Sequence, residues 1–424
     1  MQISSAKINK ALKRGAEFIA QSQEANGSWV AKDSALRPTF GVRPIITTVN
    51  GIDALAIMDD IKYIHNIERG LNFCLNYKLH TVEDDIVQWA WKLRALDYMH
   101  TQKSDKSKKT IVDFLISKQN SNGSWQVYPQ DLLWTPFLIN GSYLDLPHSA
   151  IVKTCDWFMT IRAKDGKGWG RNPNDVISEV SSTAFVSTIL SFSGMNTKNE
   201  IMQKSRKFIE SAQNSDGSWS SWGSNPSIWS TAMCIKVLLC LNNNITKCVT
   251  DAVSYLLSIQ ATDGGWENPH KKISDIYTTS YAMRGLMSYK IAKDATDYDK
   301  KEFTKMLVGD NFYMYLINRF FRYNKYAVQD LVLKNILNSK LFGNTRSVID
   351  RRKRIISILS ENGELRSAEI IDFLKKYPTY QKLNKKSHLT QINYDLEHLR
   401  DLNIIRKNNR KYFIIIDPER INSY

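Results

Sequence analysis

Three carboxylates occupy an equivalent place in separate parts of the chain and are the residues best suited to acid chemistry. Asp85, Glu179 and Asp275 each lie eleven residues before a leucine of an apolar segment, and Asp84 directly precedes the first of them. A carboxylic acid in an apolar, water-poor setting keeps its proton and can serve as a general acid. In the first turn of a helix the same residues instead cap free backbone N–H groups. Both interpretations apply to these four candidates.

Aromatic side chains lie in the same apolar segments. The candidates for lining a cavity are Trp89, Trp91, Trp134, Phe185, Trp229, Tyr277 and Tyr281. Aromatic faces suit packing against a polyene and stabilise a cation. At helical spacing, ordinary packing between two helix layers explains them equally well.

A recurring pattern predicts the elements that position these residues. Residues 208–219 read FIESAQNSDGSW, residues 18–29, 114–125 and 255–266 are copies, and residues 157–169 are a looser copy with Arg162 near the place of the glutamine. The copies recur about every 48 residues, and a degenerate copy is expected at residues 68–79. We therefore predict six repeats, each with an outer helix, a Gly-x-Trp turn and an inner helix. The predicted inner helices cover residues 44–58, 84–99, 130–144, 177–192, 226–241 and 273–289.

The repeated Gln and Gly-x-Trp residues resemble the QW motifs of the squalene–hopene and oxidosqualene cyclase superfamily, which shares its fold with protein prenyltransferase β subunits. The resemblance covers about residues 5–290 and implies a mainly α fold, an (α/α)6 toroid of six helical hairpins around an apolar cavity. From the residues themselves we predict that the glutamine and tryptophan join the end of one outer helix to its neighbour through a hydrogen bond and ring packing.

The catalytic motifs of this superfamily are degenerate here. Its class II cyclases use the central Asp of a DxDD motif followed by Thr-Ala, and the matching stretch begins at Glu179 with Ser181 in the proton donor's place. The prenyltransferase zinc site is also unmatched, because Thr278 stands where the resemblance places a histidine. We therefore expect no metal and no cofactor, and the balance of the motifs favours a protein without catalytic activity.

Composition predicts a globular, cytoplasmic protein. No long uncharged apolar run appears, so no transmembrane segment is expected. The five cysteines show no metal-binding spacing and are expected to be reduced, buried thiols. The net charge is +16, and residues 345–424 hold 17 Lys and Arg against 10 Asp and Glu, which indicates a polyanionic partner for this region.

Three domains are predicted: the toroid at residues 1–292, a helical connector at 293–344, and a small α+β domain at 345–424. In the last of these, helices at residues 351–361, 367–376 and 388–402 precede a basic hairpin at 404–415 that turns at Asn408 and Asn409. This order resembles the winged helix-turn-helix of bacterial transcription regulators. A winged helix used to dock protein is the alternative.

The winged-helix resemblance implies contacts to double-stranded DNA. Residues at the start of the third helix would reach base edges: His388, Thr390, Gln391, Asn393 and Tyr394. Basic residues would contact phosphates: Lys385, Lys386, Arg406, Lys407, Arg410 and Lys411.

Three functional hypotheses result. The first is a DNA-binding regulator or sensor whose non-catalytic toroid binds an apolar ligand, either isoprenoid-like or a peptide. The second is a divergent class II terpene cyclase. The third is a protein-interaction subunit of a defence or mobile-element system. The sequence decides neither the ligand, nor the DNA site, nor the oligomeric state.

Overall fold

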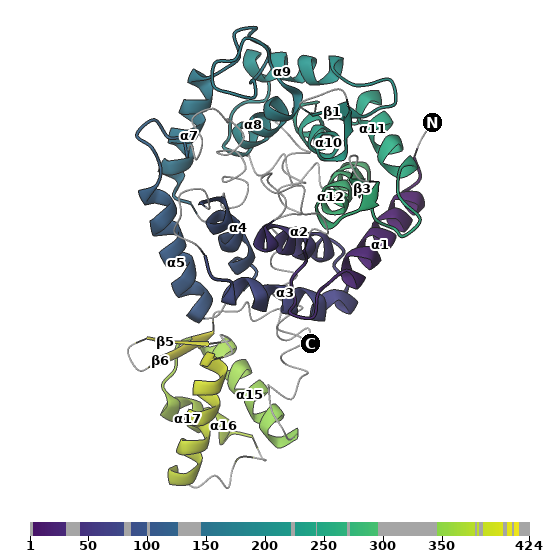
Figure 1. The fold of residues 1–424 in the computed structure, drawn as a ribbon. Helices are drawn as coiled ribbons and strands as arrows, with labels where there is room; N and C mark the ends of the chain where they lie inside the picture. Colours follow the sequence, from purple (N-terminus) through teal and green to yellow (C-terminus); the bar gives the residue numbers. More distant parts are fainter. Residues whose placement is uncertain are drawn as a thin grey trace. The chain divides into compact units, whose positions relative to one another are not determined.

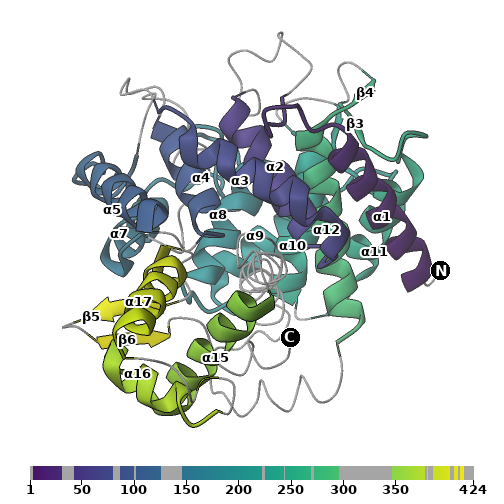
Figure 2. The same ribbon diagram turned by 90° about the horizontal axis from the view of Figure 1, so that it is seen from below.

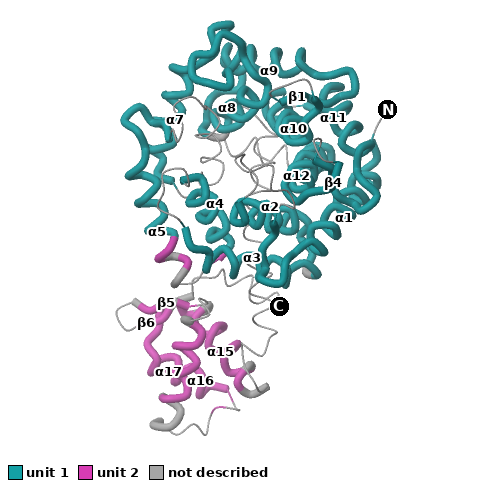
Figure 3. The backbone as a smooth tube through the Cα atoms, in the orientation of Figure 1, with its two compact units in different colours: residues 1–98, 108–326 teal, residues 99–107, 327–424 magenta. Residues whose placement is uncertain are grey.

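The computed structural model describes residues 3–30, 43–79, 86–99, 102–125, 146–221, 225–242, 244–268, 272–295, 346–377, 380, 385–401, 405–408 and 411–414. Contacts divide the chain into two compact units (Figure 3). One unit holds residues 1–98 and 108–326, and the other holds residues 99–107 and 327–424.

The first unit is an α/α toroid with an outer ring of helices around an inner ring (Figures 1 and 2). The outer helices are α1 (Ser5–Gln21), α3 (Ile64–Asn76), α5 (Gln102–Ser117), α7 (His148–Thr160), α9 (Glu200–Ser211) and α11 (Lys247–Ser258), and a 3-10 turn, η2 (Ile61–Tyr63), precedes α3. The inner helices are α2 (Pro44–Ala56), α4 (Ile86–Leu96), α8 (Val180–Phe192), α10 (Ile228–Asn242) and α12 (Ile276–Lys293). The alternation of outer and inner helices confirms the predicted fold class.

The outer and inner helices differ in how much of their surface is buried, as their sequences predict. Outer helix α1 buries a single stripe at helical spacing, from Ile8 through Leu12 to Ile19. Inner helix α2 buries every residue from Ile45 to Ala56. An inner helix is therefore apolar nearly all round because both of its faces are covered.

The tryptophan turns that precede a described inner helix fasten that helix to the outer helix of the same repeat. Trp219 is fully buried, its ring Nε1 donates to the carbonyl of Ile209 at 2.7 Å, and its backbone N–H donates to Oγ1 of Thr231 on α10 at 3.0 Å. Trp29, Trp169 and Trp266 make the same two kinds of bond. Gly217 has φ +89°, and a Cβ there would lie 2.6 Å from the carbonyl oxygen of Asp251, so the turn requires glycine.

The glutamine that recurs in the repeats joins its outer helix to the next one. Gln213 Nε2 donates to the carbonyls of Gly217 in its own turn, at 2.9 Å, and of Cys248 on α11, at 2.8 Å. Gln260 makes the equivalent bond to Ala11 on α1 at 2.9 Å, which closes the ring between its last and first outer helices. This confirms the predicted role of the glutamines.

Two copies depart from the pattern. Arg162, in the glutamine's place, donates to the carbonyl of Gly166 within its own turn. In the degenerate copy at residues 68–79, the carbonyl of Tyr77 accepts a hydrogen bond of 2.6 Å from the ammonium group of Lys92 on inner helix α4. The Tyr77 hydroxyl donates to Oε1 of Gln88 at 2.8 Å. A lysine and a tyrosine thus fasten α3 to α4 where no Gly-x-Trp turn exists.

Short antiparallel strand pairs precede two inner helices. β1 (Trp219–Ser220) pairs with β2 (Pro226–Ser227), and β3 (Glu267–Asn268) pairs with β4 (Ile273–Ser274). These pairs take up the first residues of the predicted inner helices, so α10 and α12 begin two or three residues later than expected. The predicted inner helix at 130–144 lies outside the described residues, as does the predicted connector beyond residue 295.

The second unit contains three helices and a hairpin: α15 (Arg346–Asn362), α16 (Ser367–Leu374), α17 (Lys385–Asp401), β5 (Ile405–Asn408) and β6 (Lys411–Ile414). Gly363 follows α15 with φ +72°, a left-handed conformation that favours glycine at the end of a helix. The residue ahead of α16 is Arg366, whose N–H donates to the Glu369 carboxylate at 2.6 Å, so Ser367 is the first helical residue. The predicted turn residue Asn409 lies outside the described residues.

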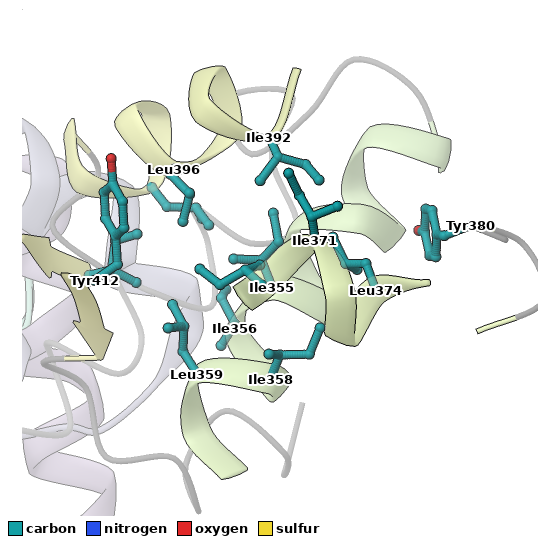
Figure 4. Close-up of a cluster of buried hydrophobic side chains, with 13 residues drawn as sticks. Ile355, Ile356, Ile358, Leu359, Ile371, Leu374, Tyr380, Ile392, Leu396 and Tyr412 are labelled. Atoms are coloured by element: carbon teal, nitrogen blue, oxygen red, sulfur yellow. The ribbon is translucent and has the colours of Figure 1, made fainter. Parts of the chain in front are cut away.

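A small apolar core unites these elements (Figure 4). Ile355, Ile371, Leu374, Ile392 and Leu396 pack together, and Tyr412 of β6 covers one end. Leu365 and Tyr412 exchange two backbone hydrogen bonds of 3.0 and 2.7 Å, which adds a third short extended segment beside the hairpin. The buried Asp395 carboxylate of α17 pairs with Arg351 and Arg352 of α15.

Candidate functional site: the inner face of the toroid

A threonine that recurs in the inner helices defines which face of each helix points toward the outer ring. Thr48, Thr183, Thr231 and Thr279 accept hydrogen bonds from the backbone N–H groups of Trp29, Trp169, Trp219 and Trp266, respectively. An α-helix turns by about 100° per residue. Residues two before, two after and five after each threonine therefore lie on the opposite side, which is the inner face of the toroid.

Four aromatic side chains on this inner face form a continuous wall. Phe185 of α8 lies edge-on to Trp229 of α10, with ring centroids 6.0 Å apart. Trp229 lies edge-on to Tyr281 of α12 at 6.2 Å, and Tyr281 contacts Tyr277 at 4.8 Å. We call Phe185, Trp229, Tyr277 and Tyr281 the aromatic wall. All four are sequence candidates, and the structure brings them together across three consecutive inner helices.

The remaining aromatic candidates have different surroundings. Trp91 lies on the inner face of α4, fully buried, with the Arg94 guanidinium 5.9 Å from its ring. Trp89 occupies the place of the recurring threonine and stacks on Phe114 of outer helix α5 at 4.0 Å. It therefore packs between the helix layers. Trp134 lies outside the described residues.

Charged side chains also lie on the inner face, five residues after the position of the recurring threonine. Asp53 of α2, Arg94 of α4, Lys236 of α10 and Arg284 of α12 each lie two residues before the leucine shared by these helices. We call these four residues the charged arc. Asp53 is 2% exposed, and its Oδ2 accepts from Arg94 Nε at 2.7 Å and from Arg284. Its Oδ1 accepts from the Tyr98 hydroxyl at 2.6 Å.

The environment of the charged arc changes the pKa values of its neighbours. Burial, reinforced by the charges of Arg94 and Arg284, lowers the pKa of Lys236 to about 8. Burial and then the Asp53 carboxylate raise the pKa of Tyr98 well above its ordinary value. These residues were not among the sequence candidates, although their common distance from the shared leucine was a detectable signal.

Two of the candidate acids cap inner helices. Glu179 Oε2 accepts from the N–H of Ser182 at 2.7 Å at the start of α8. Asp275 accepts from the N–H and hydroxyl of Thr278 at 2.8 and 2.6 Å at the start of α12. Burial raises the pKa of Asp275, although these hydrogen bonds act against the shift. Asp84 and Asp85 lie outside the described residues.

The residues that replace family catalytic groups are engaged in structural bonds. Ser181, in the proton donor's place, has its hydroxyl 2.7 Å from that of Ser230 and 3.1 Å from that of Ser221. Thr278, in the place of a zinc-binding histidine, is bonded to Asp275. Within the described ranges, no group of three or more His, Cys, Asp or Glu is arranged to hold a metal ion.

Some of the residues predicted to contact DNA lie on the exposed surface of the second unit. Thr390, Gln391 and Tyr394 of α17 are exposed, and Asn393 is half-buried. Lys407 is exposed and lies 4.9 Å over the Tyr412 ring, and Lys411 is half-buried. The side chains of Lys385, Lys386, His388 and Arg406, and all of Arg410, lie outside the described residues.

Comparison with known proteins supports the toroid assignment. Residues 147–288 match the family model of the squalene–hopene cyclase C-terminal domain. The apo structure of the type II terpene cyclase MstE from Scytonema superposes with a TM-score of 0.52 at 13% identity, covering 69% of this chain and 99% of that one. This unit is a terpene-cyclase-like toroid. A complex of an MstE variant with its product, merosterolic acid A, gives a TM-score of 0.51 at 14% identity, covering 68% and 98% of the two chains.

No curated protein matches the sequence. None of the helices in the described part of the chain combines the length and apolar character needed to cross a bilayer.

Proposed function

We propose that the chain is a divergent relative of type II terpene cyclases whose toroid takes up an isoprenoid-like molecule against the aromatic wall. The supporting observation is the run of ring contacts from Phe185 through Trp229 to Tyr281 and Tyr277 on the inner face. Trp229 and Tyr277 retain partial exposure, so their rings can offer a face to a ligand. Polyene chains pack well on such faces, and a carbocation is attracted to them.

Cyclisation in this toroid would depend on one of the four candidate acids, Asp84, Asp85, Glu179 or Asp275. Burial raises the pKa of Asp275, which favours the protonated form that a general acid requires, although its hydrogen bonds to Thr278 act against this shift. A serine hydroxyl at position 181 is far too weak an acid to protonate an alkene.

Ligand uptake is tested by titrating the full-length protein with farnesol and following tryptophan fluorescence. Trp229→Leu removes the centre of the aromatic wall and is expected to weaken binding by about tenfold or more, equivalent to ~1.4 kcal/mol. Trp89→Leu is the matched control, since this ring packs against Phe114 between the layers. Equal effects of the two substitutions, or no binding to the wild-type protein, would contradict the proposal.

Catalysis is tested separately by product analysis with linear isoprenoids. The cyclase proposal predicts a cyclised product from the wild-type protein and its loss in at least one of the variants Asp84→Asn, Asp85→Asn, Glu179→Gln and Asp275→Asn. Retained ligand binding without any product would instead support the non-catalytic receptor.

We propose DNA binding as a second function, carried by the C-terminal unit. The three helices, the hairpin and the Leu365–Tyr412 pairing support a winged-helix arrangement. The exposed Thr390, Gln391 and Tyr394 suit contacts to bases.

Charge reversal at Arg410 and Lys411 should weaken binding to all DNA sequences alike in a salt-titrated mobility assay. Unchanged binding would exclude the hairpin from the DNA contact, and gel filtration with candidate partner proteins tests the protein-docking alternative.

A further inference from the structure

The outer ring of the toroid carries a surface pocket of about 260 Å³ beside helix α3. Its lining combines three carboxamides with two aromatic rings: Asn26, Asn72, Phe73, Asn76 and Tyr77. Asn26 belongs to the Gly-x-Trp turn that follows α1, and the other four residues lie at the C-terminal end of α3, its neighbour in the outer ring (Figure 1). No lining side chain carries a formal charge. Pockets for drug-sized ligands begin at about 300 Å³, so this pocket suits a single small ring.

Helix α3 differs from the other outer helices at the positions that form this pocket. Phe73 lies three residues before the end of α3, a place that an aromatic residue takes in every described outer helix. The residue before it is Asn72, whereas the same residue is charged in four of the other five helices. The first residue after the helix is aromatic only in α3, as Tyr77. A neutral lining with two rings is therefore specific to α3. The matching aromatic residues of the other helices are Phe18, Phe114, Trp157, Phe208 and Tyr255.

The two rings of the pocket form a V. Tyr77 caps α3 in an extended conformation, with φ −62° and ψ 124°, and its hydroxyl bond to Gln88 fixes the ring. The Phe73 ring lies beside it, with centroids 5.5 Å apart and planes inclined by 51°. Two rings at this angle cannot both lie flat on a planar base, whereas a puckered, saturated ring can touch both of their faces.

The turn at the edge of the pocket holds one carboxamide in a fixed orientation. Arg69 of α3 donates to the carbonyls of Glu24 and Ala25 at 2.6 and 3.2 Å, which ties the turn to the helix. Asn26 Oδ1 accepts from the N–H and the hydroxyl of Ser28 at 2.9 and 2.7 Å. Because its oxygen is engaged inside the turn, Asn26 offers its Nδ2 amino group to the pocket as a donor.

Helix α3 supplies further hydrogen-bonding groups. Asn72 and Asn76 lie one helical turn apart, and Asn76 Nδ2 donates to the carbonyl of Asn72 at 3.0 Å. The Asn72 side chain is exposed and makes no hydrogen bond to any residue that the structure describes. A carboxamide offers a donor and an acceptor side by side, which matches two adjacent hydroxyl groups of a ligand.

We propose that this pocket binds a neutral sugar, one pyranose ring seated in the V. The C–H groups on the face of a pyranose are attracted to the electron-rich faces of aromatic rings, and the hydroxyl groups at its edge pair with carboxamides. The uncharged lining favours a neutral sugar over a uronate, a sugar phosphate or a nucleotide. A proline ring would also fit the V, but it has no hydroxyl groups for Asn26 and Asn72. This inference goes beyond the proposed function and does not depend on it.

Saturation-transfer NMR on the full-length protein tests the ligand class. The neutral probes are methyl α-glucoside, methyl β-galactoside, methyl α-mannoside and N-acetylglucosamine, and at least one should bind with a Kd of about 1 mM or lower. Glucuronic acid is expected to bind more weakly than the best neutral sugar. The capped tripeptide acetyl-Pro-Pro-Pro-amide represents the proline alternative. Absence of binding by all four neutral sugars, tighter binding of glucuronic acid, or binding of the tripeptide alone would overturn the inference.

A substitution in the turn tests the donor. Asn26→Asp replaces the amino group with an acceptor oxygen but keeps the oxygen that bonds Ser28. The turn accommodates this change, because Asp216 accepts the same two bonds from Ser218 in a later repeat. Sugar binding should weaken about tenfold, since the pocket loses a donor and gains a negative charge. Asn122→Asp makes the same change in another turn and should leave binding unchanged.

A second pair of variants tests the rings. Phe73→Leu removes one side of the V and should weaken sugar binding at least severalfold. Phe208→Leu makes the same change at the equivalent place of α9 and is the control. Sugar binding that survives both Asn26→Asp and Phe73→Leu would show that the sugar does not bind in this pocket. Farnesol and DNA binding should be unchanged in Asn26→Asp, so failure of the sugar site leaves the proposed function intact.

Discussion

The Nε atom of Arg94 donates a hydrogen bond to Oδ2 of Asp53 over 2.7 Å, which joins inner helices α4 and α2. Arg284 of α12 reaches the same oxygen, although it is 231 residues away in sequence. This carboxylate therefore connects the first two repeats to the last one. It is an interior counterpart to the bond by which Gln260 closes the outer ring on Ala11.

Replacement of Asp53 is predicted to destabilise the toroid strongly. Asp53→Asn removes the negative charge but keeps the side-chain size, so Arg94 and Arg284 lose the charge that balances them. Breaking a buried ion pair on one side costs about 3–5 kcal/mol of the free energy of unfolding. Urea denaturation measures this loss. Asp294→Asn breaks the i,i+4 pair with Lys290 at the end of α12 and should cost less than about 1 kcal/mol. Similar losses in both variants would argue against a central role for Asp53.

The glutamine of the repeat is predicted to stabilise the contact between neighbouring outer helices. Gln213→Ala leaves the carbonyls of Gly217 and Cys248 without their side-chain donor, at a cost of about 1–3 kcal/mol. Gln203→Ala is the control, because this residue also lies on α9 but bonds to Thr197 within its own repeat. Thermal denaturation should show the larger decrease for Gln213→Ala. The reverse order would contradict the role given to the repeat.

Asp275 is predicted to make stability depend on pH in a particular direction. Burial raises the pKa of this carboxyl in the folded protein, so the folded state holds the proton more tightly than the unfolded chain does. Its contribution to stability is therefore greatest below the unfolded pKa of about 3.9 and falls as pH rises through the folded pKa.

Two substitutions separate the charge of Asp275 from its capping bond. Asp275→Asn can still accept from the N–H of Thr278, so it should remove this pH dependence without loss of stability near neutral pH. Asp275→Ala loses the cap, at about 1 kcal/mol. Melting curves recorded from acidic to neutral pH compare the three proteins. An Asn variant as unstable as the Ala variant would show that the cap requires the negative charge.

The cysteines are predicted to be unreactive in the native protein. All five are free, and Cys74, Cys234 and Cys240 are buried. Burial raises the pKa of Cys240 to about 12, and that of Cys248 likewise to about 12, so little thiolate is present at neutral pH. A water-soluble disulfide reagent should label the unfolded protein rapidly and the native protein far more slowly. Fast labelling of Cys74, Cys234 or Cys240 in the native protein would contradict the burial of these three thiols.

Local repetition explains why much of the fold could be predicted. The bonds of Gln213 and Trp219 lie within one repeat or between neighbours, so several copies of the same residues reveal them. The four residues of the aromatic wall were also among the sequence candidates, because they lie in predicted inner helices. The charged arc was missed although its four members share one distance from the recurring leucine, because the pairing of Asp53 with Arg284 forms only when the ring closes. The start of α12 was placed too early because strand β4 uses residues 273 and 274.

The central claim is that the inner face of the toroid holds an isoprenoid-like molecule against the aromatic wall. The most direct measurement is mass spectrometry of an organic extract from the full-length protein, purified without detergent, alongside Trp229→Leu and the Trp89→Leu control. The account predicts a stoichiometric isoprenoid-like compound in the wild-type and control proteins, and its depletion in Trp229→Leu. An empty wild-type extract, or a compound retained equally by all three proteins, would contradict this claim.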